Sequence, residues 1–271
     1  MSHLDSVPQK PWVVIKLGGS SLQEEKVVRQ IAKDVKKLSD LNYKLLIIHG
    51  GGPAINEALT EKKITWEFIE GQRKTTLEMM TVIENTLFGT VNRKIQKIFS
   101  QEGIPVVGLS GSDLEMLLCE PQNESLGLVG LVKKVNSEVI KVLSERSPLK
   151  IVPLVAPIGV DEKGERYNIN ADMAAMNLAV DLKAQHLVYM TDQPGIWDQN
   201  KQPIKEIESL ALYQLTETHV VQGGMLVKVR AVIQALRNNV QEVDIIDARR
   251  EGNLFSLVHE NKSVGTRCYR N

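Results

Sequence analysis

The chain has 271 residues, of which 42% are hydrophobic, enough for the core of one large domain or of two lobes. Lysine plus arginine and aspartate plus glutamate number 33 each, and aromatic residues make up only 4%, so nucleic-acid binding is not expected. The sequence contains no run of about 18 apolar residues, so it predicts no membrane span.

The two cysteines, Cys119 and Cys268, are far apart and form no Cys-x-x-Cys motif, so neither a disulfide framework nor a zinc site is indicated. The first eleven residues are polar and lack the apolar core of a signal peptide. We therefore expect a cytoplasmic protein.

Short runs rich in β-branched residues alternate with longer segments whose apolar residues recur at helical spacing. Helices are expected at 23–41 and at 76–100, the second opening with a capping box at 75–78. Strands are expected at 12–17, 44–49, 104–109, 150–155, 186–190 and 242–246. This alternation predicts an α/β fold with an open, mostly parallel sheet sandwiched by helices.

The remaining segments do not follow this alternation of strands and helices. Residues 64–69 alternate in polarity as a strand does, and we expect a hairpin over a site there. We expect one domain, 1–271, in which an N-terminal lobe, 12–165, and a C-terminal lobe, 166–271, share one continuous sheet. Further extended or hairpin segments are expected at 116–120, 127–135 and 157–168.

Two glycine clusters directly follow predicted strands. Gly18 and Gly19 follow the strand that carries Lys16, and a His-Gly-Gly-Gly-Pro run at 49–53 follows the next strand. Glycine allows a backbone to approach a ligand closely, proline is favoured in the first turn of a helix, and a helix N-terminus binds anions. The pattern favours polyphosphate binding, although such clusters also occur as ordinary turns. No P-loop and no Gly-x-Gly-x-x-Gly occurs, so a dinucleotide-dependent dehydrogenase has no motif support.

Polar residues also mark two later segments. Asn168 and Asn170 alternate with an isoleucine and would point the same way, and Asp172 falls in the first turn of the next helix. An ordinary helix cap explains this pattern equally well. Thr191 and Asp192 end a strand, where ligands of open α/β sheets bind, but they also suit a simple turn.

Lys228 lies in the first turns of a predicted helix, after Gly223 and Gly224. A lysine in that position opposes the helix dipole, so a purely structural role is disfavoured. We interpret Lys228 as a cation that faces a ligand.

In order and spacing, these segments resemble the amino-acid kinase family, and within it the N-acetyl-L-glutamate kinases. The resemblance extends from residue 12 to residue 266. Its motifs are Lys-Leu-Gly-Gly at 16–19, His-Gly-Gly-Gly-Pro at 49–53, Gly-Gln-Arg-Lys-Thr at 71–75, Gly-Thr-Val-Asn at 89–92, Asn-Ile-Asn-Ala-Asp at 168–172, Thr-Asp at 191–192 and Gly-Met-x-x-Lys at 224–228.

The resemblance implies transfer of the γ-phosphoryl group of ATP to the side-chain carboxylate of N-acetyl-L-glutamate, a step of arginine biosynthesis. It implies that Lys16 and Lys228 stabilise the transferring phosphoryl group and that Asp172 orients both. It also implies that Mg²⁺ bridges the ATP phosphates, with no metal site of the protein's own. The implied acceptor-binding residues are Gly51, Gly52, Arg73 and Asn168, and the implied nucleotide-binding residues are Gly18, Gly19, Thr191 and Asp192.

Some positions depart from the family pattern. Lys74 stands where a valine or similar residue is usual, residues 108–114 lack a common Asp-Gly pair, and Gln193 replaces a small apolar residue. The acceptor could therefore be N-acetyl-aminoadipate, glutamate or carbamate, and a catalytically silent sensor is a further alternative. Too few residues precede the first strand for the N-terminal helix of arginine-inhibited hexamers, so we expect an arginine-insensitive homodimer.

Overall fold

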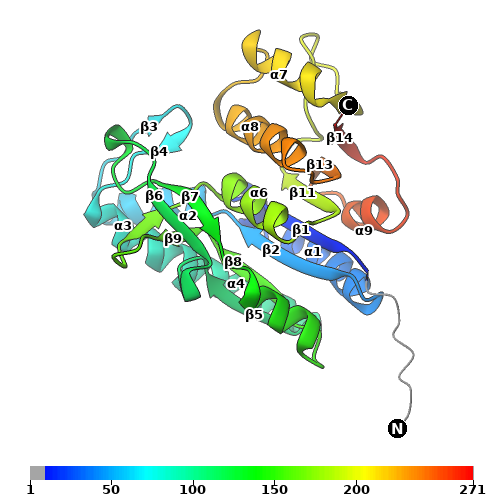
Figure 1. Cartoon of the computed structure of the whole chain (residues 1–271), viewed down its shortest axis with the longest axis horizontal. Coiled ribbons are helices and arrows are strands. Elements are labelled where there is room, and N and C mark those ends of the chain that lie inside the picture. Colours follow the sequence, from blue (N-terminus) through cyan, green and yellow to red (C-terminus); the bar gives the residue numbers. More distant parts are fainter. Residues whose placement is uncertain (1–9, 271) are drawn as a thin grey trace.

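A computed structural model describes residues 10–270, and the expected absence of a signal peptide concerns residues outside this range. Its main feature is an eight-stranded sheet in which every neighbouring pair is parallel except β13 and β14 (Figure 1). In sheet order the strands are β12 (Glu206–Glu208), β14 (Gly265–Tyr269), β13 (Glu242–Asp247), β11 (His186–Thr191), β1 (Trp12–Leu17), β2 (Lys44–His49), β8 (Val152–Ala156) and β5 (Val106–Ser110). The predicted α/β class is confirmed.

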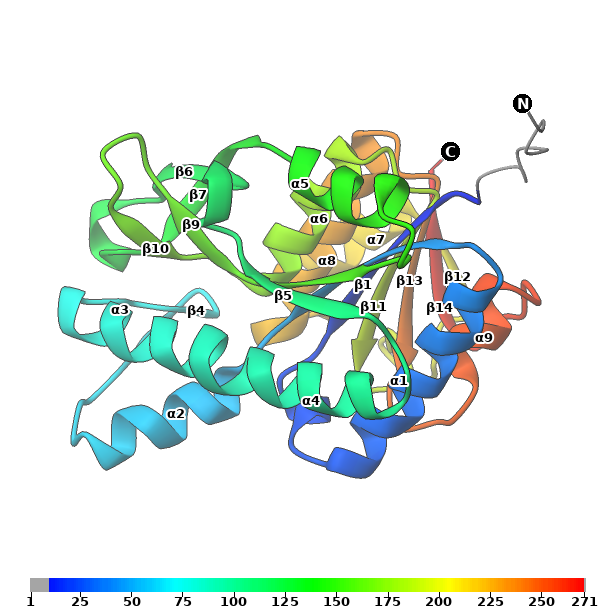
Figure 2. The same ribbon diagram turned by 90° about the horizontal axis from the view of Figure 1, so that it is seen from below.

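Helices cover both faces of this sheet (Figure 2). One face carries α1 (Glu25–Asp40), α4 (Arg93–Gln101) and α9 (Asn253–Val258). The other carries α6 (Ala171–Asp181) and α8 (Gly223–Arg237), with α7 (Ser209–Glu217) packed on α8.

Alternation along β1 explains which side chains face which layer. Val13, Ile15 and Leu17 belong to the core beneath α1 and α4, whereas Trp12 and Val14 belong to the core beneath α6 and α8. Successive strand residues point to opposite faces, so Lys16 lies on the α6 and α8 side. A lysine is thereby placed inside an otherwise apolar layer.

The rest of the chain forms smaller elements beside the sheet. The hairpin of β3 (Phe68–Ile69) and β4 (Gln72–Arg73) confirms the expected hairpin. A four-stranded sheet contains β10 (Arg166–Asn168), β9 (Ile158–Val160), β6 (Leu117–Pro121) and β7 (Gly130–Val135). The remaining helices are α2 (Gly52–Glu61), α3 (Leu77–Glu84), α5 (Glu138–Lys141), π-helical Asn85–Asn92 and Val142–Arg146, and short 3₁₀ turns at Ser20–Leu22, Asp113–Glu115 and Glu124–Leu126.

The long helix predicted at 76–100 differs from expectation in two respects. Its N-cap is Thr76, whose hydroxyl accepts a hydrogen bond of 3.3 Å from the Met79 amide, rather than Thr75. Thr75 is buried and donates to the Arg73 carbonyl at 2.9 Å instead. The helix also passes through the π-helical segment Asn85–Asn92 between α3 and α4. No helix within residues 10–270 is long and apolar enough to cross a membrane.

Candidate active site

The two glycine clusters meet at the carboxyl ends of β1 and β2. The Gly50 amide donates to the Leu17 carbonyl at 2.9 Å, which joins the end of one strand to the loop after the other. A Cβ added to Gly19 would lie only 3.0 Å from the Gly52 amide nitrogen. The two loops are therefore in backbone contact, and a side chain at position 19 would separate them.

The second glycine cluster leads directly into α2. Pro53 occupies the first turn of that helix, and no side chain among residues 10–270 caps its N-terminus. The first amide groups of a helix lack partners within the helix and carry a partial positive charge. The start of α2 is therefore able to bind an anionic group, as its sequence predicts.

His49 connects this loop to the π-helical segment. Its Nδ1 lies 3.0 Å from the Gly50 carbonyl, which can only accept, so Nδ1 carries the proton. Its Nε2 then accepts from Asn92 Nδ2 at 3.1 Å, and the same Asn92 amide donates to the Leu154 carbonyl at 3.0 Å. Burial lowers the pKa of His49 to about 4, so the ring is neutral at physiological pH.

Three charged side chains from different elements converge beside these loops. Lys16 extends from β1, Asp172 lies in the first turn of α6, and Lys228 extends from α8. Both lysine Nζ atoms lie 2.9 Å from the same oxygen, Oδ1 of Asp172. Each of the three residues is less than a tenth exposed. Buried charges need such pairing, because an isolated one would lose its hydration without compensation.

The pKa values of Asp172 and Lys228 are shifted by burial and by the neighbouring charges of the trio. Burial alone would raise the pKa of the Asp172 carboxyl, but Lys16 and Lys228 outweigh it and lower that pKa to about 2. Burial lowers the pKa of Lys228 to about 8; Asp172 opposes this effect and Lys16 adds to it. With both lysines protonated, the trio carries a net charge of +1. It is therefore suited to an anionic ligand.

The cap alternative for Asn170 also holds. Its side-chain oxygen accepts from the Asp172 amide at 2.9 Å and from the Met173 amide at 3.3 Å. The cap fixes the first turn of α6, which is the turn that carries the Asp172 carboxylate. The structural and the functional interpretation of this segment are thus compatible.

A cavity of about 380 Å³ lies against Lys16, Asp172 and the glycine loops. It brings together most of the site residues expected from the sequence. These are Lys16, Gly19, Gly51, Gly52, Arg73, Asn168 and Asp172.

The other expected residues lie outside the lining of this cavity. Lys228 reaches it only through its bond to Asp172. Gly18 donates to the Met190 carbonyl at 2.9 Å and so lies beside Thr191 at the end of β11. The backbone carbonyl of Asp192, the next residue, accepts a hydrogen bond of 2.6 Å from Arg249.

Arg73 enters the cavity from the β3–β4 hairpin. Its Nη2 donates to Asn56 Oδ1 at 2.5 Å, and its guanidinium lies 4.7 Å from the Phe68 ring centroid and 5.6 Å from that of Trp66. Its Nη1 is buried without a partner among the described residues. Burial lowers the pKa of Arg73 to about 10, so the group stays cationic. A buried cation with a free donor is suited to bind a carboxylate.

The hairpin also contacts the C-terminal half of the chain. Gly71, in its turn, has φ +80°, and an added Cβ would lie 3.1 Å from Val227 Cγ2 and 3.2 Å from the Gly223 carbonyl. The hairpin that carries Arg73 therefore packs against the first turns of the helix that carries Lys228.

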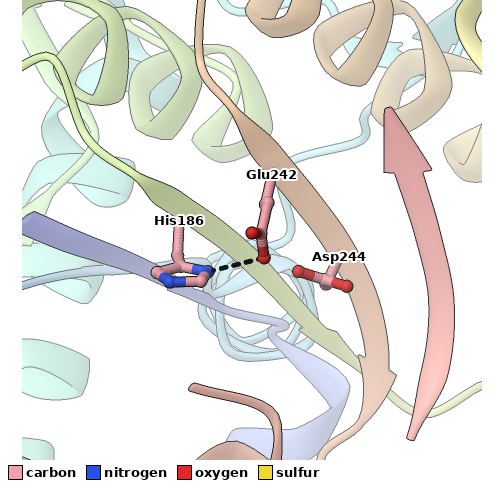
Figure 3. A group of neighbouring side chains, drawn as sticks. All are labelled: His186, Glu242 and Asp244. Carbon is pink, nitrogen blue, oxygen red and sulfur yellow. Dashed lines mark ion pairs between the residues drawn. The ribbon is translucent and has the colours of Figure 1, made fainter. Parts of the chain in front are cut away.

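A second cluster of ionisable groups, drawn in Figure 3, contains no residue that lines the cavity. His186 and Glu242 are the first residues of β11 and β13, and His186 Nδ1 lies 3.2 Å from Glu242 Oε2. With Asp244 they could offer three ligand atoms to a metal ion. Arg267, however, lies 3.1 Å from Asp244 and 3.5 Å from Glu242. A cation already pairs with both carboxylates, so we interpret the cluster as a structural ion network.

Sequence reasoning missed several residues of the site. It assigned no role to His49, Asn56 or Asn92, although each of the three lies within a quoted motif or beside one. An imidazole that directly precedes three glycines could have suggested a group that supports the loop. The partner role of Asn92 had no local signal, because it depends on where the π-helical segment lies.

The fold agrees with comparisons to known proteins. The sequence model of the amino acid kinase family matches residues 11–247, and the chain belongs to that family. It is 37% identical over 265 residues to an acetylglutamate kinase of Trichlorobacter lovleyi, covering 93% of this chain and 90% of that protein. It is 36% identical over 270 residues to an acetylglutamate kinase of Aquifex aeolicus, with the same coverages.

Solved structures show the same architecture. The protein smu.665 from Streptococcus mutans superposes with a TM-score of 0.83 at 28% identity, covering 95% of this chain and 98% of that one. A carbamate kinase of Giardia superposes with a TM-score of 0.71 at 18% identity, covering 97% and 99%. The likeness to the carbamate kinase concerns the fold alone. The family resemblance inferred from the motifs is confirmed.

Proposed function

We propose that the protein transfers the γ-phosphoryl group of ATP to the side-chain carboxylate of N-acetyl-L-glutamate, giving N-acetyl-L-glutamyl 5-phosphate for arginine biosynthesis. The observation that carries the proposal is the pair of buried lysines on Asp172, beside a cavity that Arg73 also lines. Relatives named acetylglutamate kinase, aligned over more than nine-tenths of the chain, support the acceptor.

In this proposal the acceptor carboxylate attacks directly and needs no general base, since it carries no proton. Lys16 and Lys228 neutralise the oxygens of the transferring phosphoryl group, where charge is concentrated in the transition state. Amide groups of Gly51 and Gly52 contact the reacting carboxylate. Arg73 binds the α-carboxylate of the acceptor, and Asn168, which donates to Thr75 at 3.2 Å, contacts its polar groups.

We assign the nucleotide to the ends of β1 and β11, with Gly18, Gly19, Thr191 and Asp192 as its contacts. Mg²⁺ arrives with ATP, as MgATP. In support, Asp172 is the sole carboxylate among the described residues that line the cavity, and both of its bonds to lysine use the same oxygen. A single carboxylate that already pairs with two ammonium groups is a poor site for a resident Mg²⁺, which prefers uncommitted oxygen ligands.

The remaining assignments concern organisation and location. We propose an acceptor-binding lobe of residues 12–165 and a nucleotide-binding lobe of residues 166–271, assembled as an arginine-insensitive homodimer in the cytoplasm. Cys119 and Cys268 support the reducing location, since both are free and buried. Burial also raises the pKa of Cys119 to about 12. Light scattering with and without L-arginine tests the assembly.

The reaction is tested by trapping the acyl phosphate with hydroxylamine. The protein is incubated with MgATP and N-acetyl-L-glutamate, L-glutamate or N-acetyl-aminoadipate, and the hydroxamate is measured. We expect product chiefly from N-acetyl-L-glutamate. Product from another acid would overturn the acceptor and leave the reaction class standing. ATP binding without any product would instead identify a catalytically silent sensor.

A further inference from the structure

Tyr189 contacts two members of the lysine–aspartate trio. It lies on β11, directly beside Lys16 of β1 in the parallel register, and it is fully buried. Its hydroxyl donates to the backbone carbonyl of Asp172 at 3.0 Å. Its ring centroid lies 5.0 Å from Nζ of Lys228. One side chain thus contacts both the first turn of α6 and the cation supplied by α8.

We propose that Tyr189 is a positioning residue for phosphoryl transfer, whose ring holds the Lys228 ammonium group in place and whose hydroxyl fixes the turn that carries Asp172. The proposal rests on the proposed function, because it concerns the same reacting centre. It adds a neutral aromatic group to the charged groups that prepare the site before substrates bind.

The electrostatics of the trio explain why an aromatic ring is needed there. Two ammonium groups share one carboxylate oxygen, so one positive charge is left without a full partner. The face of an aromatic ring carries partial negative charge and attracts a cation within about 6 Å. The charged groups around Lys228 are Asp172 and Lys16. The ring thus supplies attraction without adding a second carboxylate, which would neutralise the site.

The hydroxyl has a separate role. Burial raises the pKa of Tyr189 well above its usual range, so the phenol keeps its proton and acts only as a donor. Cys268, which lies near it, is also buried and its pKa is raised by burial, so it adds no charge at neutral pH. The two functions of Tyr189 can therefore be separated by substitution. Tyr189→Phe removes the hydroxyl alone, whereas Tyr189→Leu removes the ring as well.

The test compares pH–rate profiles from about pH 6.5 to 10 for the wild type and both variants, using ADP release. Tyr189→Leu should move the alkaline limb of kcat down by about one pH unit and lower kcat about tenfold, with smaller changes in KM. Tyr189→Phe should lower kcat a few-fold and leave the limb in place. Phe99→Leu, which removes a fully buried ring from the opposite core, is the matched control.

A readout without substrates separates this proposal from the function it rests on. The titration of Lys228 is followed by NMR of ¹³C-labelled lysine in the wild type and the variants. A lower midpoint in Tyr189→Leu, absent in Phe99→Leu, supports the ring's role even if no acceptor is phosphorylated. An unchanged midpoint and an unchanged alkaline limb in Tyr189→Leu would overturn it. If the leucine variant does not fold, Tyr189→Met replaces it.

Discussion

Asn92 donates a hydrogen bond of 3.1 Å to Nε2 of His49, and this contact joins the π-helical segment to the loop of three glycines. His49 in turn donates from Nδ1 to the Gly50 carbonyl at 3.0 Å. Both amide hydrogens of Asn92 and both nitrogens of the ring are therefore satisfied. The backbone that is proposed to contact the reacting carboxylate is thus supported by a buried, uncharged network.

Replacing Asn92 by leucine should damage both stability and activity. The change leaves His49 Nε2 buried without a donor and removes the hydrogen bond from Asn92 to the Leu154 carbonyl. We expect the free energy of unfolding to fall by about 1–3 kcal/mol. We also expect kcat to fall about ten- to a hundredfold, because the glycine loop loses its support. Urea denaturation and hydroxamate formation measure the two effects.

Gln96→Leu is the matched control. Gln96 donates to Asn92 Oδ1 at 2.7 Å from a partly exposed position, so its removal leaves the bonds to His49 and Leu154 intact. Asn92 Oδ1 loses its donor, so we expect a smaller loss of stability than in Asn92→Leu, about 1 kcal/mol, and a kcat near that of the wild type. Equal effects of the two substitutions would contradict the role assigned to the His49 contact.

Removing either lysine of the trio should abolish turnover without weakening the fold. Lys16→Met or Lys228→Met leaves one lysine opposite Asp172, a neutral buried pair. We expect kcat to fall at least about 10²–10³-fold, as for loss of a positioned transition-state donor. The free energy of unfolding should stay within about 1 kcal/mol of the wild type.

Asp172→Asn should reduce stability as well as turnover, unlike the two lysine substitutions. It leaves two buried lysines without a counter-charge, so it should lower stability by about 3–5 kcal/mol as well as abolish activity. Near-normal turnover in any of these three variants would exclude the proposed roles.

Stability should depend on the pH through Lys228. Its pKa in the folded protein is about 8, below its ordinary value of 10.5, so the unfolded chain binds a proton that the native protein releases between these values. The stability of the wild type relative to Lys228→Met should therefore rise with pH across this window, by up to about 1.4 kcal/mol per pH unit. Urea denaturation of both proteins at about pH 7.5 and 9.5 measures this. If the stability difference between the two proteins stays constant or falls with pH, the pKa of Lys228 is not lowered in the folded protein.

Arg73→Lys should impair acceptor binding selectively. A lysine cannot reproduce the planar fork that reaches Asn56 while keeping a second donor free for a carboxylate. We expect KM for N-acetyl-L-glutamate to rise about ten- to a hundredfold, with KM for ATP nearly unchanged. Lys74→Met is the neighbouring control, because Lys74 is partly exposed and pairs with Glu67 at 2.7 Å. A parallel rise in KM for ATP would argue against the assignment of Arg73 to the acceptor.

Gly19→Ala should reduce activity through sterics alone. The added methyl group would lie 3.0 Å from both the Gly52 amide nitrogen and Pro53 Cδ, so the two loops must move apart. We expect kcat to fall at least about tenfold, since misplacement on this scale is costly in a preorganised site. Gly89→Ala, where an added Cβ meets nothing within 4 Å, should be nearly neutral. Steady-state rates of the two variants decide this prediction.

Local sequence signals predicted the strands whose ends are set by neighbouring residues in the chain. The strands β1 and β2 match expectation residue for residue, because each apolar run ends at a histidine or glycine boundary. The capping site moved by one residue, since Thr75 has a tertiary partner in Asn168. The π-helical segment was not predicted, because its spacing of apolar residues is that of an ordinary helix.

The residues of the candidate site carry signals in the sequence, but their geometry does not. Lys16, Asp172 and Lys228 carry signals in the sequence, yet their shared oxygen follows only from the packing of α6 and α8 on β1. Residues 108–114, which lack the Asp-Gly pair common in the family, still form a turn. Leu114 adopts φ +51° there, in the left-handed region where glycine is usual.

The order of strands in the main sheet has a consequence for attempts to express the two halves separately. β1 pairs with β11 along a register that runs from Val13–His186 to Leu17–Met190, and the proposed lobe boundary divides that pair. Cutting there would expose two long, apolar strand edges, which invite aggregation. Chimaeras between relatives are a safer route to exchanging substrate preference, provided that they preserve this register.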